Sequence, residues 1–165
     1  MNDEIVLRTA GITKRFPGTL ALDNVDFTLQ RGELHGLVGE NGAGKSTFVK
    51  IVSGAYLKDA GQIWLNEQPF DPRNILHCSQ NGISIIFQES AVVPDLTVAE
   101  NIFLNELTTY GRLFLNWRKL NSRAKKMMVE LGVDLDPRLR AGTLPVGQQK
   151  IVELVKALST NPLIL

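Results

Sequence analysis

The chain has 165 residues, of which 44% are hydrophobic and 21% charged, and a formal net charge of +1. These values suit one globular domain and argue against a broad charged surface for nucleic acid or anionic lipid. A single cysteine, Cys78, excludes an internal disulfide. The sequence shows no apolar run near the roughly 20 residues that span a bilayer, and no secretion signal at its start. We therefore expect a soluble, cytoplasmic chain.

The first half of the chain is rich in predicted strands. Strands are expected over residues 4–16, 22–33, 34–40, 61–65 and 83–89. The first two alternate apolar and polar residues, which is typical of antiparallel strands. The runs "LHGLVGE" (34–40) and "ISIIFQE" (83–89) are mostly apolar and predict buried strands. Between them, a helix is expected from Gly44 to Ser53, with Gly54 as its C-terminal stop.

The second half of the chain is mostly helical in its pattern. Helices are predicted over residues 97–107, 116–132 and 146–159, and "LIL" (163–165) begins another apolar strand. Thr97 and Glu100 have the spacing of a capping box, and Asn116 is a candidate N-cap. The order of elements predicts an α/β fold with an antiparallel lobe and a helical insertion.

Four residues, Gly39, Gly44, Lys45 and Ser46, match the phosphate-binding pattern G-x-x-x-x-G-K-[ST]. Glycines let the backbone curl around an anion, and the following helix directs its free N–H groups at the same point. The alternative is a glycine-rich turn without a ligand, which arises by chance in about one chain in a hundred of this length. The motif alone leaves kinases, GTPases and motor ATPases open.

The predicted roles in this loop follow from side-chain chemistry. Lys45 supplies a mobile cation for the β- and γ-phosphates, the Ser46 hydroxyl is a ligand for Mg²⁺, and Thr47 reaches the α-phosphate. The remaining loop residues contribute mainly backbone N–H groups: Asn41, Gly42 and Ala43.

Residues 14–54 resemble the start of ABC-type ATPase domains almost throughout. The resemblance implies that Phe16 stacks on adenine, although an apolar strand residue could equally serve packing alone. The stretch "SIIFQES" (84–90) is similar to the Q-loop of that family. By this resemblance Gln88 turns its amide toward Mg²⁺ and the attacking water, and its segment contacts a membrane subunit.

The region "TLPVGQQKIVELVKAL" resembles the family's signature segment, usually written LSGGQ. The five matching positions are Leu144, Pro145, Val146, Gly147 and Gln148. In the family this segment begins a helix and contacts the γ-phosphate held by the opposite ATPase domain. Pro145 replaces a serine, which removes a hydroxyl and a backbone N–H, and Val146 replaces a glycine. Both changes weaken the case for a productive site that uses this signature.

The phrasing of "GENGAGKST", "LTVAENIFL" and "VGQQKIVE" resembles the monosaccharide-importer branch of ABC transporters over residues 5–165. In that branch one polypeptide carries two ATPase domains, and one of them is often degenerate. The strand at "LIL" would run into the Walker B acids, which do not follow here. We therefore expect a partial ABC ATPase domain over 1–165: an antiparallel lobe and P-loop core over about 1–92, a helical subdomain over about 93–158, and the start of the Walker B strand over 159–165.

The resemblance implies an ATPase subunit at the cytoplasmic face of the membrane that uses ATP and Mg²⁺ to power sugar import. Lys45 and Gln88 would be catalytic, and Ser46 and Gln88 would hold the metal. The implied partners are membrane permease subunits, a second ATPase domain and, indirectly, a sugar-binding protein, with no nucleic acid. We expect this chain alone not to hydrolyse ATP. The alternatives are a soluble ABC protein of translation or DNA repair, and an importer of another solute.

Overall fold

A computed structural model of the chain describes residues 4–88, 91–110 and 116–165. The chain forms two compact units, Met1–Ile83 with Ile164 and Ser84–Leu163 with Leu165. The first unit contains an antiparallel sheet and the second is helical, which confirms the predicted α/β class. The predicted lobe boundary near residue 92 stays a prediction.

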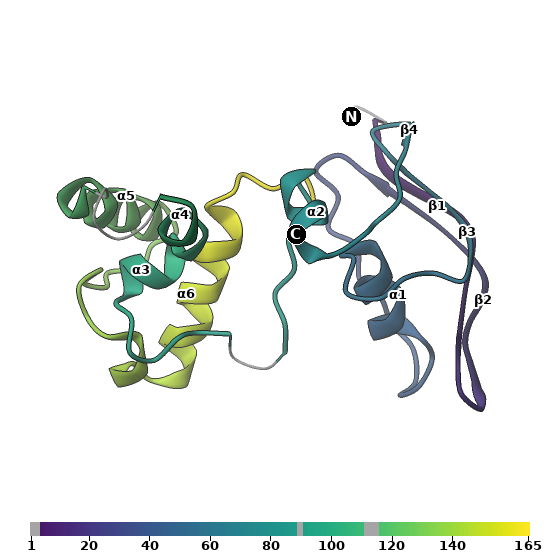
Figure 1. Cartoon of the computed structure of the whole chain (residues 1–165), viewed down its shortest axis with the longest axis horizontal. Coiled ribbons are helices and arrows are strands. Elements are labelled where there is room, and N and C mark those ends of the chain that lie inside the picture. Colours follow the sequence, from purple (N-terminus) through teal and green to yellow (C-terminus); the bar gives the residue numbers. More distant parts are fainter. Residues whose placement is uncertain (1–3, 89–90, 111–115) are drawn as a thin grey trace. The chain divides into compact units, whose positions relative to one another are not determined.

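The sheet of the first unit has the strand order β2-β1-β3-β4. Its strands are β1 (Ile5–Phe16), β2 (Thr19–Gln30), β3 (Ala60–Leu65) and β4 (Gln68–Pro69). All neighbouring pairs are antiparallel, and β1 and β2 form a long hairpin (Figure 1). The antiparallel strands predicted from the alternating pattern are present, and Val6, Leu7, Ile12 and Ile63 are buried.

Helix α1 (Lys45–Val52) packs on the sheet through Phe48, whose ring centroid lies 5.1 Å from that of Phe27 in β2. The helix ends as predicted: the Gly54 N–H donates to the Ile51 carbonyl at 3.0 Å, and Gly54 has φ +77°.

A second helix, α2 (Ile75–Gln80), was not predicted from the sequence. Its N-cap is Asn74, whose side chain accepts the His77 N–H at 2.8 Å, and its buried residue is Cys78. A Cβ at Gly54 would lie 2.8 Å from the Cys78 sulfur, so Gly54 also allows α2 to approach the end of α1 closely.

Two strand predictions are wrong. Residues 33–40 adopt no regular structure, and Leu34 and Val38 are 99% and 94% exposed. The other strand was predicted over 83–89, of which residue 89 lies outside the described residues. Among residues 83–88, only Ile83 pairs, through an isolated parallel bridge to Ile164, and Ile86 is exposed. A parallel strand needs partners from distant parts of the chain on its edges, and the described residues supply no more than that one bridge here.

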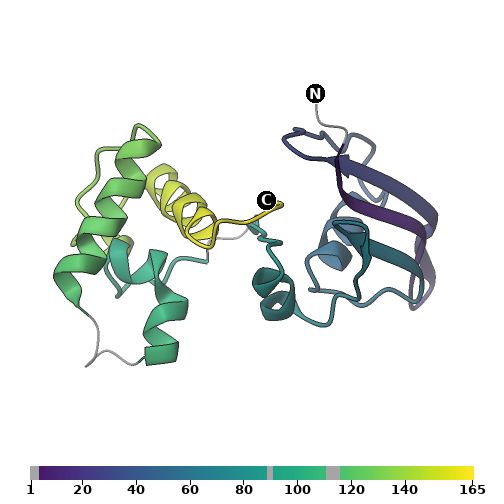
Figure 2. The same ribbon diagram turned by 90° about the horizontal axis from the view of Figure 1, so that it is seen from above.

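The second unit is a helical cluster. Its helices are α3 (Val98–Ile102), α4 (Leu104–Tyr110), α5 (Trp117–Glu130) and α6 (Val146–Leu158), with a 3₁₀-helix at Ala141–Thr143. Helix α3 packs against both α6 and α5 (Figures 1 and 2). The core between them is formed by Val98, Ile102, Phe103, Leu120, Ala124, Met128, Val152 and Val155.

The predicted capping signals of this unit are confirmed. Thr97 and Glu100 form a capping box, and the Asn116 side chain accepts the Lys119 N–H at 3.1 Å. The helix predicted over 97–107 is instead divided into α3 and α4, because Phe103 leaves helical geometry between them.

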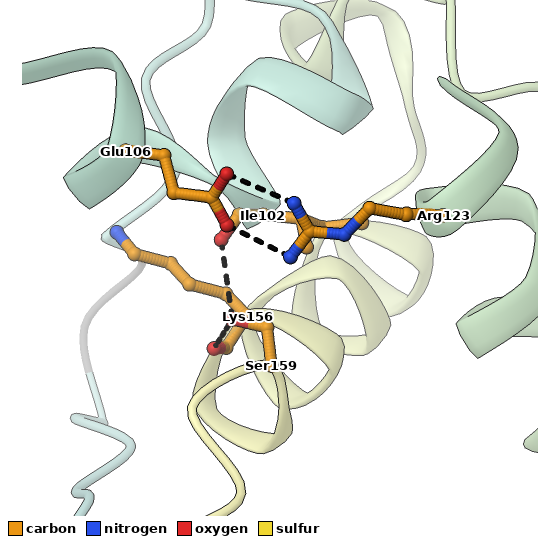
Figure 3. A network of polar contacts seen from close by, with 5 residues as sticks. All are labelled: Ile102, Glu106, Arg123, Lys156 and Ser159. Atoms are coloured by element: carbon orange, nitrogen blue, oxygen red, sulfur yellow. Dashed lines mark hydrogen bonds and ion pairs between the residues drawn. The ribbon is translucent and has the colours of Figure 1, made fainter. Parts of the chain in front are cut away.

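Polar contacts join α4 to α5 and the end of α6 to α3 (Figure 3). The Arg123 guanidinium of α5 donates two hydrogen bonds, of 2.8 and 2.9 Å, to the Glu106 carboxylate of α4. At the end of α6, the Ser159 hydroxyl bonds to the Lys156 carbonyl at 2.7 Å and to the Ile102 carbonyl at 3.5 Å. Bidentate pairs of this kind fix orientation as well as distance, so α4 and α5 keep one relative placement.

We predict that Cys78 resists alkylation in the folded protein. Its side chain is fully buried, and burial raises the pKa of the thiol from about 9 to about 11. Because the thiolate is the reactive form, iodoacetamide at pH 8 should modify native protein at least about 100-fold more slowly than urea-unfolded protein.

The raised pKa of Cys78 also makes the free energy of unfolding depend on pH. Because the folded state favours the protonated thiol, the contribution of Cys78 to stability is complete below pH 9 and is lost as the pH rises through about 11. Mass spectrometry of modified Cys78 checks the prediction, and equal rates in native and unfolded protein would contradict it.

Candidate nucleotide site

The loop before α1 is built so that the backbone closes against β2. Gly44 has φ +84°, and a Cβ at this position would lie 2.5 Å from the Ala21 carbonyl oxygen and 2.7 Å from Leu22. Gly42 has φ +88°, with open space around it. These two glycines of the loop therefore serve different needs: Gly44 permits close contact and Gly42 permits a left-handed turn.

The start of α1 offers free backbone donors. The first hydrogen bond of the helix runs from the Phe48 N–H to the Gly44 carbonyl at 2.9 Å, which leaves the N–H groups of Lys45, Ser46 and Thr47 without a helical acceptor. Gly44 provides no side-chain cap, and the first turn, all of it described, contains no acidic residue. The positive end of the helix dipole is thus not compensated by the chain's own side chains, which favours an anion there.

Lys45 brings a positive charge to the same loop. Its ammonium donates to the carbonyl oxygens of Gly39 and Glu40, both at 2.7 Å, so the side chain folds back over the turn. Ser46 is exposed and Thr47 is half-buried. An ammonium, free helix N–H groups and an accessible hydroxyl form a donor set that fits a phosphate chain and, beside it, a hard cation such as Mg²⁺.

Phe16 lies at the end of β1 and is half-buried. Its ring meets the edge of Tyr56, with centroids 5.5 Å apart and an interplanar angle of 70°. Tyr56 is tied to α1, because its N–H donates to the Lys50 carbonyl at 3.0 Å and the Lys50 ammonium lies 5.1 Å from its ring centroid. Tyr56 was not among the residues predicted from the sequence, because nothing in the local pattern links it to Phe16.

The end of β1 is fixed by Asp59. Its carboxylate accepts the Lys14 ammonium at 2.8 Å and the Arg15 N–H at 2.6 Å, and these bonds hold the pKa of Asp59 below its usual value. The Lys14 ammonium also lies 5.5 Å from the Phe16 ring centroid. The aromatic ring predicted to stack on a base is therefore held between charged and aromatic neighbours.

The other predicted site residues belong to the second unit. Gln88 is exposed and follows the irregular segment 84–87. The signature-like segment precedes and begins α6: Leu144 is buried, Pro145 is the N-cap, and Val146 is 71% exposed. Gly147 has open space at its Cβ position, and the predicted contacts of Gln148 remain predictions.

Pro145 leaves the start of α6 without a side-chain cap. Its φ and ψ, −55° and 150°, are close to those that a capping serine would adopt. The Gln149 side-chain amide donates to the Leu144 carbonyl at 2.9 Å, a bond that does not cap the first N–H groups of the helix. The departure from the serine pattern is therefore accommodated without distortion of the helix start.

A family model described as ABC transporter matches residues 22–165. The chain is 46% identical to the xylose import ATP-binding protein XylG of Geobacillus kaustophilus over 158 residues, covering 94% of this chain and 31% of that protein. It is 45% identical to the ribose import ATP-binding protein RbsA 1 of Rubrobacter xylanophilus, covering 97% and 32%. The chain thus spans about a third of the length of these relatives.

Two solved structures also match the fold of this chain. A nucleotide-free ATP-binding cassette from an ABC transporter matches with a TM-score of 0.80 and 28% identity, covering 96% of this chain and 66% of that chain. The ADP conformation of the cassette MJ1267 matches with the same values.

We predict that Gly44→Ala destabilises the first unit more than Gly42→Ala. Both changes place alanine at a left-handed φ, which costs roughly 1–2 kcal/mol. Only Gly44→Ala also forces a Cβ against the β2 backbone, so its loss of unfolding free energy should exceed about 2 kcal/mol. Urea unfolding of both variants measures the difference, and equal losses would argue against the close approach at Ala21.

We also predict that Pro145→Ser stabilises the start of α6 relative to Pro145→Ala. A serine in this extended geometry can accept a free N–H of the first turn, which is worth about 1 kcal/mol over alanine. Thermal unfolding of the two variants gives the comparison. Alanine matches serine in removing the proline ring, so indistinguishable stabilities would mean that the N–H groups are not accessible to a cap.

Proposed function

The chain belongs to the ABC transporter family, and from this membership we propose that it is the nucleotide-binding part of an ATPase that powers sugar import. The observation that carries the proposal is the start of α1, where free N–H groups, Lys45 and a glycine loop converge. This donor set suits a triphosphate better than a neutral ligand, because each donor gains from a negative acceptor.

The site residues take the following roles in this proposal. Lys45 and the loop from Gly39 to Gly44 bind the phosphates, and Phe16 stacks on the adenine. Ser46 and Gln88 bind Mg²⁺, and Gln88 also orients the attacking water. When bound, Mg²⁺ would neutralise negative charge on the phosphates. The segment from Leu144 to Gln148 meets the nucleotide of a second ATPase domain.

We assign hydrolysis to a longer polypeptide and nucleotide binding to this chain. The support is that the chain spans about a third of the length of its relatives. Since phosphoryl transfer depends on positioned charges around the phosphate, this chain alone should bind nucleotide without turnover.

The transported solute is proposed to be a monosaccharide. The relatives are named for import of xylose and ribose, which favours an importer over a soluble ABC protein of translation or DNA repair. The proposed partners are permease subunits, a second ATPase domain and, indirectly, a sugar-binding protein. The proposed location is the cytoplasmic face of the membrane, and no helix in the described ranges is long and apolar enough to cross a bilayer.

The test of the proposal is Lys45→Ala. Loss of a charge-assisted hydrogen bond is worth about 1.5–3 kcal/mol, so affinity for a fluorescent ATP analogue should fall about 10- to 100-fold. In the transporter, ATP-dependent sugar uptake should be abolished. Lys126→Ala is the control, because the Lys126 side chain is 79% exposed on α5. Unchanged binding and uptake in Lys45→Ala would refute the proposed function.

A further inference from the structure

Two side chains one turn apart on α6 contact the backbone around Gln88. The Lys150 ammonium donates to the carbonyl oxygens of Gln88 at 3.1 Å and Phe87 at 3.5 Å. The Glu153 carboxylate accepts the Ala91 N–H at 2.7 Å. The two side chains also pair with each other, at 2.8 Å between Lys150 Nζ and Glu153 Oε2. One ion pair on α6 therefore bonds the chain both at Gln88 and at Ala91.

The Glu153 carboxylate is buried and therefore depends on its partners. The Glu153 side chain is 5% exposed, and that of Lys150 is 37% exposed. A carboxylate withdrawn from water is stable only when it is paired and hydrogen-bonded, and Glu153 has both an ammonium and a backbone N–H. If Gln88 and Ala91 move away from α6, Lys150 loses the Gln88 carbonyl and Glu153 loses the Ala91 N–H, while the Lys150–Glu153 pair stays on the helix. The backbone at Gln88 and Ala91 is therefore held to α6 by hydrogen bonds to these two charged side chains.

The same helix begins with the signature-like segment. Val146 and Gly147 lie one turn before Lys150, and Val152 and Val155 anchor α6 in the core with no exposed surface. A helix of 13 residues fixed in this way behaves as one rigid element. A displacement of its first turn is therefore passed to the two side chains that hold Gln88.

We propose that Lys150 and Glu153 are positioning residues, which hold the backbone at Gln88 to α6 and couple its placement to the signature end of that helix. The proposal rests on the proposed function, in which Gln88 addresses Mg²⁺ and the attacking water. Neither Lys150 nor Glu153 needs to touch the nucleotide. Their effect should fall on the chemical step, because the phosphate grip at Lys45 and the aromatic contact at Phe16 involve neither of them.

The test uses the full-length ATPase with its membrane partner and compares Lys150→Met with Gln88→Ala and the double variant. Lys150→Met keeps the length of the side chain and removes its donors. We expect kcat for ATP hydrolysis to fall about 10- to 100-fold, as is usual for residues that orient a metal ligand, with nucleotide Kd unchanged within about 2-fold. In the Gln88→Ala background, Lys150→Met should add no further loss.

Three further variants sharpen the result. Lys150→Arg should recover most of kcat, because a guanidinium can still reach carbonyl oxygens and the carboxylate. Lys126→Met, an exposed lysine on α5, should behave as wild type. Glu153→Gln should lower kcat in the same Gln88-dependent way, and if this buried change prevents folding, the Lys150 variants carry the test alone.

Two outcomes would overturn the inference without touching the proposed function. Unchanged kcat in Lys150→Met, or fully additive losses in the double variant, would each mean that Lys150 does not act through Gln88. A purely structural role would lower thermal stability and leave the additive pattern. Failure of the proposed function is recognised separately, by Lys45→Ala retaining full activity.

Discussion

The constraint on which the candidate site depends is the contact between the first turn of α1 and the backbone of β2. The Ala21 carbonyl leaves no room for a Cβ at Gly44, so the helix must begin with a glycine in a left-handed conformation. A glycine has no side chain that could cap the helix. The N–H groups in the first turn of α1 therefore stay free and face the loop. The packing that seats α1 on the sheet is thus also what prepares its N-terminus for an anion.

Local signals in the sequence predicted the elements that depend on near neighbours. The alternation in β1 and β2, the capping box of Thr97 with Glu100, and the stop at Gly54 all act within a few residues. The strands expected over 34–40 and 83–89 depend on parallel partners far along the chain. Among the described residues, the Ile83–Ile164 bridge is the parallel pairing that either of these two segments forms. An apolar run alone therefore does not predict a strand whose partners are distant in sequence.

In the candidate site too, local features could be predicted and contacts distant in sequence could not. The glycine loop and Lys45 could be found from spacing, because the motif is contiguous and its chemistry is carried by the backbone. Tyr56, Lys150 and Glu153 could not, since each acts across about 40 to 60 residues of sequence. On a single sequence Lys150 and Glu153 look like the polar face of an amphipathic helix, and only the fold reveals that they point to Gln88 and Ala91.

The helices differ in whether a side chain caps their N-terminus, and the difference agrees with the proposed function. Helices α2, α3 and α5 begin at Asn74, Thr97 and Asn116, whose side chains accept a free N–H. Helices α1 and α6 begin at Gly44 and Pro145, which have no such bond. A side-chain cap stabilises a helix by about 1 kcal/mol, so its omission at two starts weakens the fold there. Both starts are the ones proposed to face nucleotide, where phosphate oxygens would take the place of the cap.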